Sequence, residues 1–327
     1  MTNTSVTYMG IPLRNPVIVS SSSLTGTLEG VKKAASAGAG AVVLKSLFEE
    51  QIDADLSVQT ADADTLSHPE ASEYLSGLGM QLGPNAYLDL ISQAKKEAQI
   101  PVIASINCVS TRWWGEYATQ LSKSGADGLE VNVSYLPRTL ADTGLSVERH
   151  TLAIVEKVAQ NLSIPFSVKI GPNFSAIPHL AGEIRKAGAK ALVLFNRFYQ
   201  LDVDIENMSL TAGVQFSNPQ EYNNSLRWIS FLYGTAGIEL AASTGVHDGE
   251  TLVKMLLSGA NVVQVCSTVY KHGYPIIGKM VQTLTDWMEA HSYRSTDELI
   301  GLLCREKSDN PQQYDRLQYI KALTSIH

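Results

Sequence analysis

The 327-residue chain has only three cysteines, which lie far apart at Cys108, Cys266 and Cys304. They form no C-x-x-C pair, so neither an iron–sulfur cluster nor a structural zinc site is expected, and no metal-binding residues are predicted. A scattered, odd number of cysteines is typical of a reducing compartment, and we expect a cytoplasmic protein. No run reaches the roughly 18 apolar residues of a membrane helix, and the first residues lack the basic and apolar regions of a signal peptide.

Basic residues are also few relative to acidic ones. The chain has 25 Lys and Arg against 32 Asp and Glu, a formal net charge of −7. No basic block or mixed basic and aromatic stretch stands out, which argues against nucleic acid and anionic membranes as partners. Apolar residues are abundant, because 44% of the chain is hydrophobic and only 17% is charged. This composition indicates a globular protein with a large core.

One short pattern occurs four times: Gly-Ala, two variable residues, and an apolar run opened by Val or Leu. The copies start at Gly38, Gly125, Gly188 and Gly259. Each copy follows a helix-like stretch, so its glycine is predicted to end that helix with a positive φ. Each apolar run is predicted to be a buried parallel strand. Polar residues end these runs, namely Lys45, Asn132, Asn196, and Cys266 with Ser267.

Four further apolar runs fill the gaps between these repeats, which gives eight predicted strands separated by helical patterns. The strands are predicted at about 16–21, 41–46, 101–107, 128–134, 165–170, 191–196, 238–243 and 262–267. The helices are predicted at about 28–37, 85–98, 113–124, 147–161, 177–187, 219–233, 248–258 and 274–290. Eight β/α units in about 250 residues favour an α/β fold of the closed (β/α)8 TIM-barrel type. An open doubly wound sheet is the alternative, and the lack of a G-x-G-x-x-G motif after the first strand disfavours it.

Several segments lie outside the eight units. Residues 5–13 are predicted to form a hairpin that turns at Gly10 and closes the bottom of the barrel. Two insertions leave from the carboxyl ends of strands, where they could cover the active face, and two terminal helices are predicted to pack outside. These segments are 47–83 and 197–218 for the insertions and 295–305 and 309–325 for the helices. No Pro/Gly/Ser-rich linker interrupts the chain, so residues 1–327 are expected to form a single domain.

Small polar residues follow the seventh and eighth strands, at Thr244-Gly245 and Cys266-Ser267. In many barrels, the loops after these two strands bind a phosphate through backbone N–H groups and a helix N-terminus. The alternative is that these hydroxyls only cap the helices that follow.

Lysine and asparagine side chains end other strands. Lys45 and Lys169 would each need an anion or a partner in a barrel mouth, unless their side chains extend to solvent. Asn107, Asn132 and Asn196 each offer a donor and an acceptor that suit an amide-like or heterocyclic ligand, or that could instead satisfy a neighbouring loop.

At these residues the chain resembles the dihydroorotate dehydrogenase family of flavin-containing (β/α)8 barrels, over about Tyr8 to Tyr293. The stretch Asn15-Pro-Val-Ile-Val-Ser-Ser is similar to the family's opening motif, and Asn132-Val-Ser is similar to the start of its catalytic loop. Lys45 resembles the lysine between flavin and substrate, and Lys169 resembles the lysine that contacts the flavin. The resemblance assigns to FMN the residues Ser20, Ser21, Lys45, Asn107, Asn132, Lys169, Asn196, Thr244, Gly245, Cys266 and Ser267.

The chain departs from the family pattern in its substrate half. The family's base, Cys or Ser, is replaced by Tyr135, and the Pro-Asn that follows it is replaced by Leu136-Pro137. Asn196 is followed by Arg197 where a small hydroxyl is usual, and an asparagine-containing stretch is represented only by Leu75-Ser-Gly-Leu-Gly-Met-Gln81. The flavin half is therefore predicted to be retained and the substrate half to be altered.

The resemblance implies an FMN-dependent oxidoreductase that moves a hydride between flavin and a C–C bond beside a carbonyl. The substrate would be dihydroorotate or a related dihydropyrimidine or enone, as in pyrimidine synthesis, with a homodimer as the implied assembly and the electron acceptor left open. Tyr135 and Lys45 would be catalytic, and Lys45, Asn132, Asn196 and Arg197 would bind the substrate. Two alternatives stay open: a phosphate-binding lyase or synthase barrel without flavin, and a flavin-binding protein that has lost catalysis.

Overall fold

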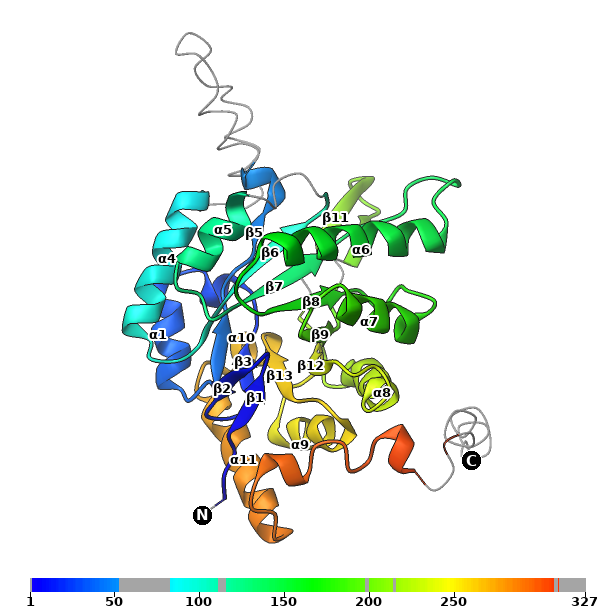
Figure 1. Ribbon diagram of the computed structural model, residues 1–327. Coiled ribbons are helices and arrows are strands. Elements are labelled where there is room, and N and C mark those ends of the chain that lie inside the picture. Colours follow the sequence, from blue (N-terminus) through cyan, green and yellow to red (C-terminus); the bar gives the residue numbers. More distant parts are fainter. Residues whose placement is uncertain are drawn as a thin grey trace.

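The eight predicted strands form a closed parallel barrel with helices on its outside (Figure 1). The computed structural model describes residues 2–52, 83–110, 116–197, 200–213, 216–308 and 311. The pairing of β13 with β3 and of β4 with β6 closes the ring, which excludes the open doubly wound sheet. In order around the ring, the strands are β3 (Val17–Val19), β4 (Ala41–Val43), β6 (Val102–Cys108), β7 (Gly128–Val133), β8 (Phe166–Ile170), β9 (Ala191–Leu194), β12 (Glu239–Ser243) and β13 (Val262–Val265).

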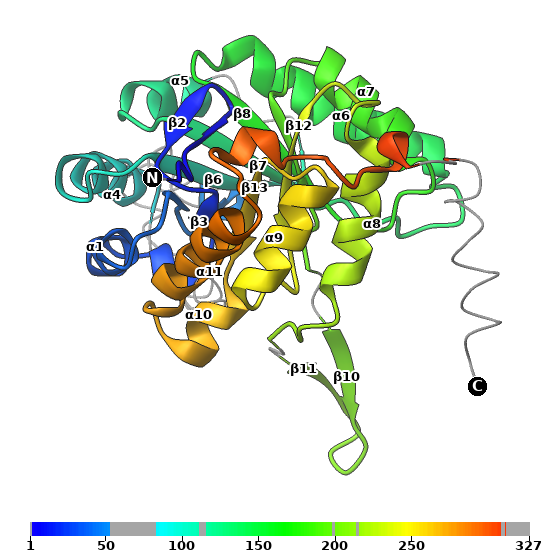
Figure 2. The same ribbon diagram turned by 90° about the horizontal axis from the view of Figure 1, so that it is seen from below.

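The helices lie on the outside of the barrel. They are α1 (Leu28–Ser36), α4 (Pro84–Glu97), α5 (Glu116–Lys123), α6 (Gly144–Asn161), α7 (Ile177–Lys186), α8 (Tyr222–Leu232), α9 (Gly249–Ser258), α10 (Ser267–His272) and α11 (Ile276–Ala290). Helices α9 and α11 are nearest the viewer when the molecule is seen from below (Figure 2). Side-chain caps fix several starts, since Thr27, Thr143 and Asp248 each accept a hydrogen bond from a backbone N–H of the first turn. No helix in the described ranges is both long and apolar enough to cross a membrane.

The four repeat glycines have the backbone conformation that the sequence predicts. Gly38, Gly125, Gly188 and Gly259 have φ of 98°, 91°, 109° and 117°. Each glycine reverses the chain out of a helix, and the apolar run after it enters the barrel as a buried strand. The repeat therefore marks a β/α unit, as predicted.

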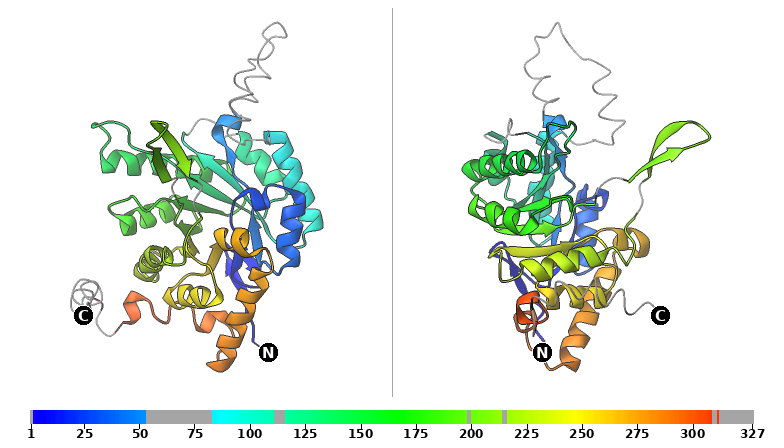
Figure 3. Two further views of the ribbon diagram at one scale, coloured as in Figure 1. Left: turned by 180° about the vertical axis from the view of Figure 1, so that it is seen from behind. Right: turned by 90° about the vertical axis from the view of Figure 1, so that its right-hand side faces the viewer.

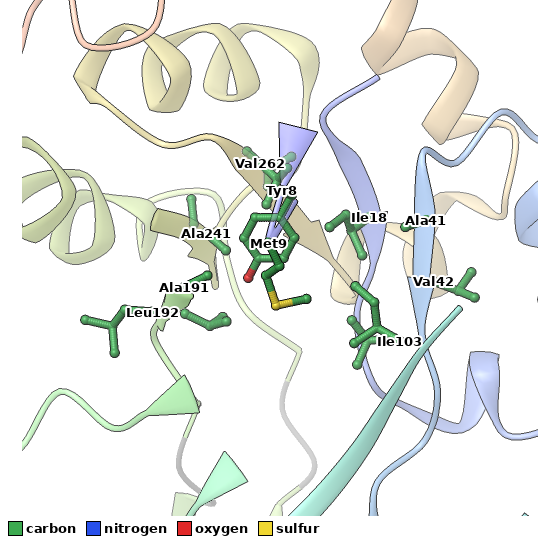
Figure 4. Packing of buried hydrophobic residues seen from close by; sticks show 14 of the residues in the cluster. Tyr8, Met9, Ile18, Ala41, Val42, Ile103, Ala191, Leu192, Ala241 and Val262 are labelled. Atoms are coloured by element: carbon green, nitrogen blue, oxygen red, sulfur yellow. The ribbon is translucent and has the colours of Figure 1, made fainter. Parts of the chain in front are cut away.

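The N-terminal hairpin closes the bottom of the barrel, and this prediction is confirmed. Strands β1 (Val6–Tyr8) and β2 (Ile11–Leu13) pair antiparallel around Met9 and Gly10, which both have positive φ. Tyr8 and Met9 are buried and lie among side chains of several barrel strands (Figure 4). The Met9 N–H donates to the Glu239 carboxylate at the start of β12, so the hairpin is fixed at the amino ends of the strands.

The insertion after β9 forms a second hairpin that the sequence analysis did not predict. Strands β10 (Gln200–Asp204) and β11 (Ser209–Gly213) pair antiparallel and project from the barrel (Figures 2 and 3). The insertion after β4 begins with the short strand β5 (Leu47–Phe48), which pairs with β6. The rest of that insertion, from 53 to 82, lies outside the described residues.

The helix predicted at 295–305 is wrong. That segment instead contains the 3₁₀ turn η3 (Thr296–Glu298), and a second 3₁₀ turn, η4 (Arg305–Lys307), begins at its last residue. Another such turn, η1 (Ser23–Thr25), follows β3. The N–H groups of Gly301 and Leu303 donate to the carbonyls of Leu256 and Leu257 at 2.9 and 2.8 Å, so they pair with the end of α9 rather than within a helix. The second predicted terminal helix, at 309–325, and the start of the helix predicted at 113–124 lie outside the described residues.

Candidate active site

A polar cavity opens at the carboxyl ends of the barrel strands, at the face where (β/α)8 barrels carry their chemistry. Its walls come from β3, β8, β9, β12, β13 and the loops that follow them. The structure brings together here nine of the residues predicted for cofactor or substrate: Ser20, Ser21, Lys169, Asn196, Arg197, Thr244, Gly245, Cys266 and Ser267.

The floor of the cavity carries a buried ammonium group. Lys169, on β8, is only 6% exposed. Its Nζ donates to Gln264 Oε1 at 3.1 Å, to Ser20 Oγ at 3.3 Å and to Glu130 Oε1 at 3.5 Å. The lysine therefore does not extend to solvent, and an anion partner inside the barrel compensates its charge.

The turn after β12 offers unpaired backbone donors to the same cavity. Thr244 and Gly245 have φ of 73° and 80°, and Thr244 Oγ1 donates to the Phe195 carbonyl at 3.1 Å. A positive φ is strained for a β-branched residue, so this hydrogen bond helps to hold the turn. Within the described part of the chain, the N–H groups of Gly245, Val246 and Ser267 donate to no backbone carbonyl. Such a group of free N–H donors suits an anion.

Asn196 lines this cavity, and the other two predicted asparagines, Asn132 and Asn107, come from the adjacent strands β7 and β6. Asn132 of β7 is in register with Asn107 of β6 on one side and with Lys169 of β8 on the other. Asn196, which follows β9, donates from Nδ2 to Asn132 Oδ1 at 3.0 Å. The Asn132 and Asn196 carboxamides are therefore linked at the barrel mouth, and Asn107 lies at the same level on β6.

Arg197 is held by an acidic partner rather than aimed freely into the cavity. Its guanidinium contacts the Glu221 carboxylate with two nitrogens, Nε at 2.9 Å and Nη2 at 3.3 Å. Burial favours a raised pKa for Glu221, but hydrogen bonds from Arg197 and from the Asn218 N–H outweigh it, so the pKa of Glu221 is lowered. The pair stays ionised and fixes the arginine at the cavity rim.

Two predicted site residues within the described ranges, Lys45 and Tyr135, do not line this cavity. Lys45 follows β4, where its side chain lies against Gly26. Tyr135 follows β7, and its hydroxyl donates to Asp142 Oδ1 at 3.5 Å while its ring lies 4.3 Å from the His150 ring. Hydrogen bonds from the N–H groups of Thr139 and Arg138 lower the pKa of Asp142, so this carboxylate remains a charged acceptor for the phenol.

Comparison with known proteins agrees with this geometry. A sequence model of the family described as dihydroorotate dehydrogenase matches residues 3–288. The chain is 27% identical to dihydroorotate dehydrogenase B (NAD(+)), catalytic subunit, of Methanothermobacter thermautotrophicus over 306 residues, which are 89% of this chain and 95% of that protein. The proteins of the same name from Thermoplasma volcanium and Pyrococcus abyssi are each 26% identical and are matched over 99% and 98% of their length, or 92% and 91% of this chain. The chain belongs to the dihydroorotate dehydrogenase family.

The family match confirms the predicted family and the predicted type of enzyme, and the closed barrel confirms the predicted fold class. The chain is an oxidoreductase of the dihydroorotate dehydrogenase type. The individual residue roles inferred from the resemblance remain predictions.

The sequence analysis missed several polar residues that build this site. Glu130 and Gln264 are buried in the barrel interior, and they surround Lys169. Their signal in the sequence is a polar residue within an apolar strand, in Gly-Leu-Glu-Val-Asn and in Val-Val-Gln-Val-Cys. Such a residue is costly to bury unless it has a partner, so it could have been recognised as part of a network.

A second missed cluster supports the cavity from the side of α10. Ser217 Oγ lies 2.9 Å from His247 Nε2, and the Ser217 N–H donates to Ser267 Oγ at 3.0 Å. Lys271 Nζ donates to the Ser217 carbonyl at 2.7 Å. His247 thus contacts a residue thirty positions earlier in the chain.

The His247 cluster makes a prediction about pH and stability. Burial, and then the positive charge of Lys271, lower the pKa of His247 below its usual 6.5, while Asp248 opposes the shift. Because the unfolded chain binds the proton more readily, this histidine contributes stability above about pH 6.5 that is lost as the pH falls. We expect the melting temperature of the wild type to fall more than that of His247→Gln between about pH 7 and about pH 5. Equal losses in the two proteins would contradict this assignment.

Proposed function

We propose that the cavity binds FMN and that the enzyme moves a hydride between this flavin and a C–C bond next to a carbonyl. The substrate would be dihydroorotate, giving orotate, or a related dihydropyrimidine or enone. One observation carries the proposal: the same cavity is lined by Lys169, which carries an ammonium group, and by Gly245, Val246 and Ser267, whose N–H groups donate to no backbone carbonyl. A flavin mononucleotide needs both, a cation beside its ring and an anion site for its phosphate.

The residues present fit the cofactor. Small side chains line the proposed phosphate end, where Gly245, Cys266 and Ser267 let the backbone approach a ligand closely. The Ser20 and Ser21 hydroxyls and Lys169 would meet the ring at the other end. Asn107, Asn132 and Lys45 would complete the ring contacts from β6, β7 and the segment after β4, and Asn196 and Thr244 would complete them from β9 and β12.

FMN, when bound, would supply the hydride chemistry. The chain's own task would be to orient the substrate and to move a proton. Asn132 and Asn196 would hold an amide-like substrate through their linked carboxamides, with Lys45 and Arg197 stabilising negative charge on it. Tyr135 would carry the proton at its phenolic oxygen, oriented by the Asp142 carboxylate. Because a phenol is a weak base but a serviceable acid near neutral pH, this role favours reduction of an activated alkene.

We extend the proposal to the compartment, the oligomeric state and the electron acceptor. We expect a cytoplasmic homodimer that uses a small-molecule substrate, with a separate electron acceptor whose nature is open. A flavin-free lyase or synthase and a flavin protein without catalysis are the competing outcomes of the following test.

The decisive experiment is anaerobic reduction of the reconstituted protein. The purified chain is incubated with FMN, freed of excess cofactor and examined by visible absorption. We expect a yellow protein whose flavin absorption is bleached by dihydroorotate or by another member of a panel of dihydropyrimidines, and whose reduced form is reoxidised by an enone. A protein that stays colourless would contradict FMN binding. A yellow protein that no panel member bleaches or reoxidises would contradict the proposed reaction alone.

A further inference from the structure

A carboxylate is buried directly beneath the proposed flavin site. Glu130, on β7, is 1% exposed, and it does not line the cavity that Lys169, Ser20 and Gln264 line. Glu130 Oε1 lies 3.5 Å from Lys169 Nζ, and Glu130 Oε2 accepts a hydrogen bond from Gln264 Nε2. The barrel therefore has a cation at its mouth and an anion one layer deeper.

The amide of Gln264 links the two charges. Its Oε1 accepts from Lys169 Nζ at 3.1 Å and from Ser20 Oγ at 3.2 Å, while its Nε2 donates to Glu130. Lys169 thus makes one hydrogen bond to each of three acceptors, which is the number of donors that an ammonium group has. The three acceptors come from β7, β13 and the end of β3, so they fix the ammonium against the rigid barrel wall rather than against a loop.

We propose that Glu130 is a positioning residue for Lys169, and that this ion pair, rather than the ammonium alone, sets the reduction potential of the bound flavin. The inference rests on the proposed FMN site. Glu130 stabilises the ammonium in a place where an unpaired charge would be costly, and it offsets part of the positive charge that the cofactor experiences.

The sign of the effect follows from electrostatics. Reduction adds negative charge to the cofactor, which a nearby cation stabilises and a nearby anion opposes. A charge in the barrel interior is weakly screened, so one unit charge a few ångströms away has a large effect. Removing the carboxylate should favour the reduced cofactor, and removing the ammonium should favour the oxidised one. Removing both groups should leave the potential almost unchanged, because the two effects have opposite signs.

A charge cycle on the FMN-loaded protein tests this. Midpoint potentials are measured against a reference dye for the wild type, Glu130→Gln, Lys169→Met and the double variant. We expect Glu130→Gln to shift the equilibrium between oxidised and reduced cofactor about tenfold or more towards the reduced form. This raises the midpoint potential by about 30 mV for a two-electron couple. Lys169→Met should shift the equilibrium by a similar factor in the opposite direction, and the double variant should return close to the wild type.

Glu239→Gln is the matched control. It removes a carboxylate from the same barrel, but one that contacts Met9 at the amino end of the strands. We expect its potential to equal that of the wild type.

The cycle remains informative if one variant does not fold. Glu130→Gln alone leaves a buried ammonium without its anion, whereas the double variant removes both charges and should fold. Comparison of Lys169→Met with the double variant then measures the same carboxylate, and the double variant should have the higher potential. A yellow protein in which neither comparison moves the potential would overturn the inference and leave the proposed function intact. A wild type that never takes up FMN would overturn both.

Discussion

Replacing Tyr135 with Phe should lower turnover by about 10²–10⁴-fold and leave the protein yellow. The variant removes only the phenolic oxygen, which we propose carries the proton. The ring contact with His150 is retained, and the Asp142 carboxylate keeps its hydrogen bonds from the N–H groups of Arg138 and Thr139. The loop should therefore keep its shape, so the loss should be in kcat, measured with the substrate that bleaches the wild type, and not in FMN binding.

Tyr233→Phe is the matched control for this prediction. It removes the same atom from a tyrosine whose hydroxyl donates to the Ile300 carbonyl at 3.2 Å, far along the chain from Tyr135. Its turnover should match the wild type. Full activity in Tyr135→Phe would remove this residue from the mechanism and would leave another group of the loop to carry the proton.

Replacing Gly245 with Ala should destabilise the fold and abolish FMN retention. The φ of this residue is 80°, and an added Cβ would lie 2.1 Å from the backbone nitrogen of Tyr222 at the start of α8. Backbone strain costs about 1–3 kcal/mol and overpacking about 1–3 kcal/mol more, which is a large part of the stability of a typical domain. Thermal unfolding of the cofactor-free protein and absorption after FMN reconstitution measure the two effects separately.

Two other glycines isolate the causes. Gly38→Ala has the strain of a positive φ but no atom within 4 Å of the added Cβ, so it should lose only the strain energy. Gly182→Ala, in α7, has neither problem, and it should be neutral or stabilising by up to about 1 kcal/mol. If Gly245→Ala melted at the temperature of Gly182→Ala and kept its FMN, the described turn would not be the phosphate site.

The barrel itself could be predicted from the sequence because its cause is local and repeated. A glycine such as Gly188 ends a helix, an apolar run such as Ala191–Leu194 follows it, and the same unit recurs along the chain. The elements that were missed or wrong lack such a local cause. The segment around Gly301 pairs with α9, and α10 is a helix of only six residues that no periodicity separates from α11.

The candidate site was predictable in part for the same reason. Strand-end residues such as Asn132 and Asn196 fall at similar offsets within the repeat, and the closed barrel brings these ends and the end of β8, with Lys169, to one face. The partners of those residues could not be assigned, because a partner is defined by which strands are neighbours and by register. Arg197 is an example: its pairing with Glu221 at 2.9 Å depends on how the start of α8 packs.

The sequence by itself determined that this chain is a (β/α)8 barrel of the dihydroorotate dehydrogenase family with a polar face at one end. Helix ends, buried strands and family motifs each depend on a few consecutive residues, so they can be recognised without the fold. Only the tertiary structure decided that the Lys169 ammonium lies between Glu130, Gln264 and Ser20, and that Tyr135 faces Asp142 and His150. The reason is that hydrogen bonds and ion pairs act through space: Glu130 and Gln264 are 134 residues apart along the chain, and closure of the barrel makes them hydrogen-bond partners.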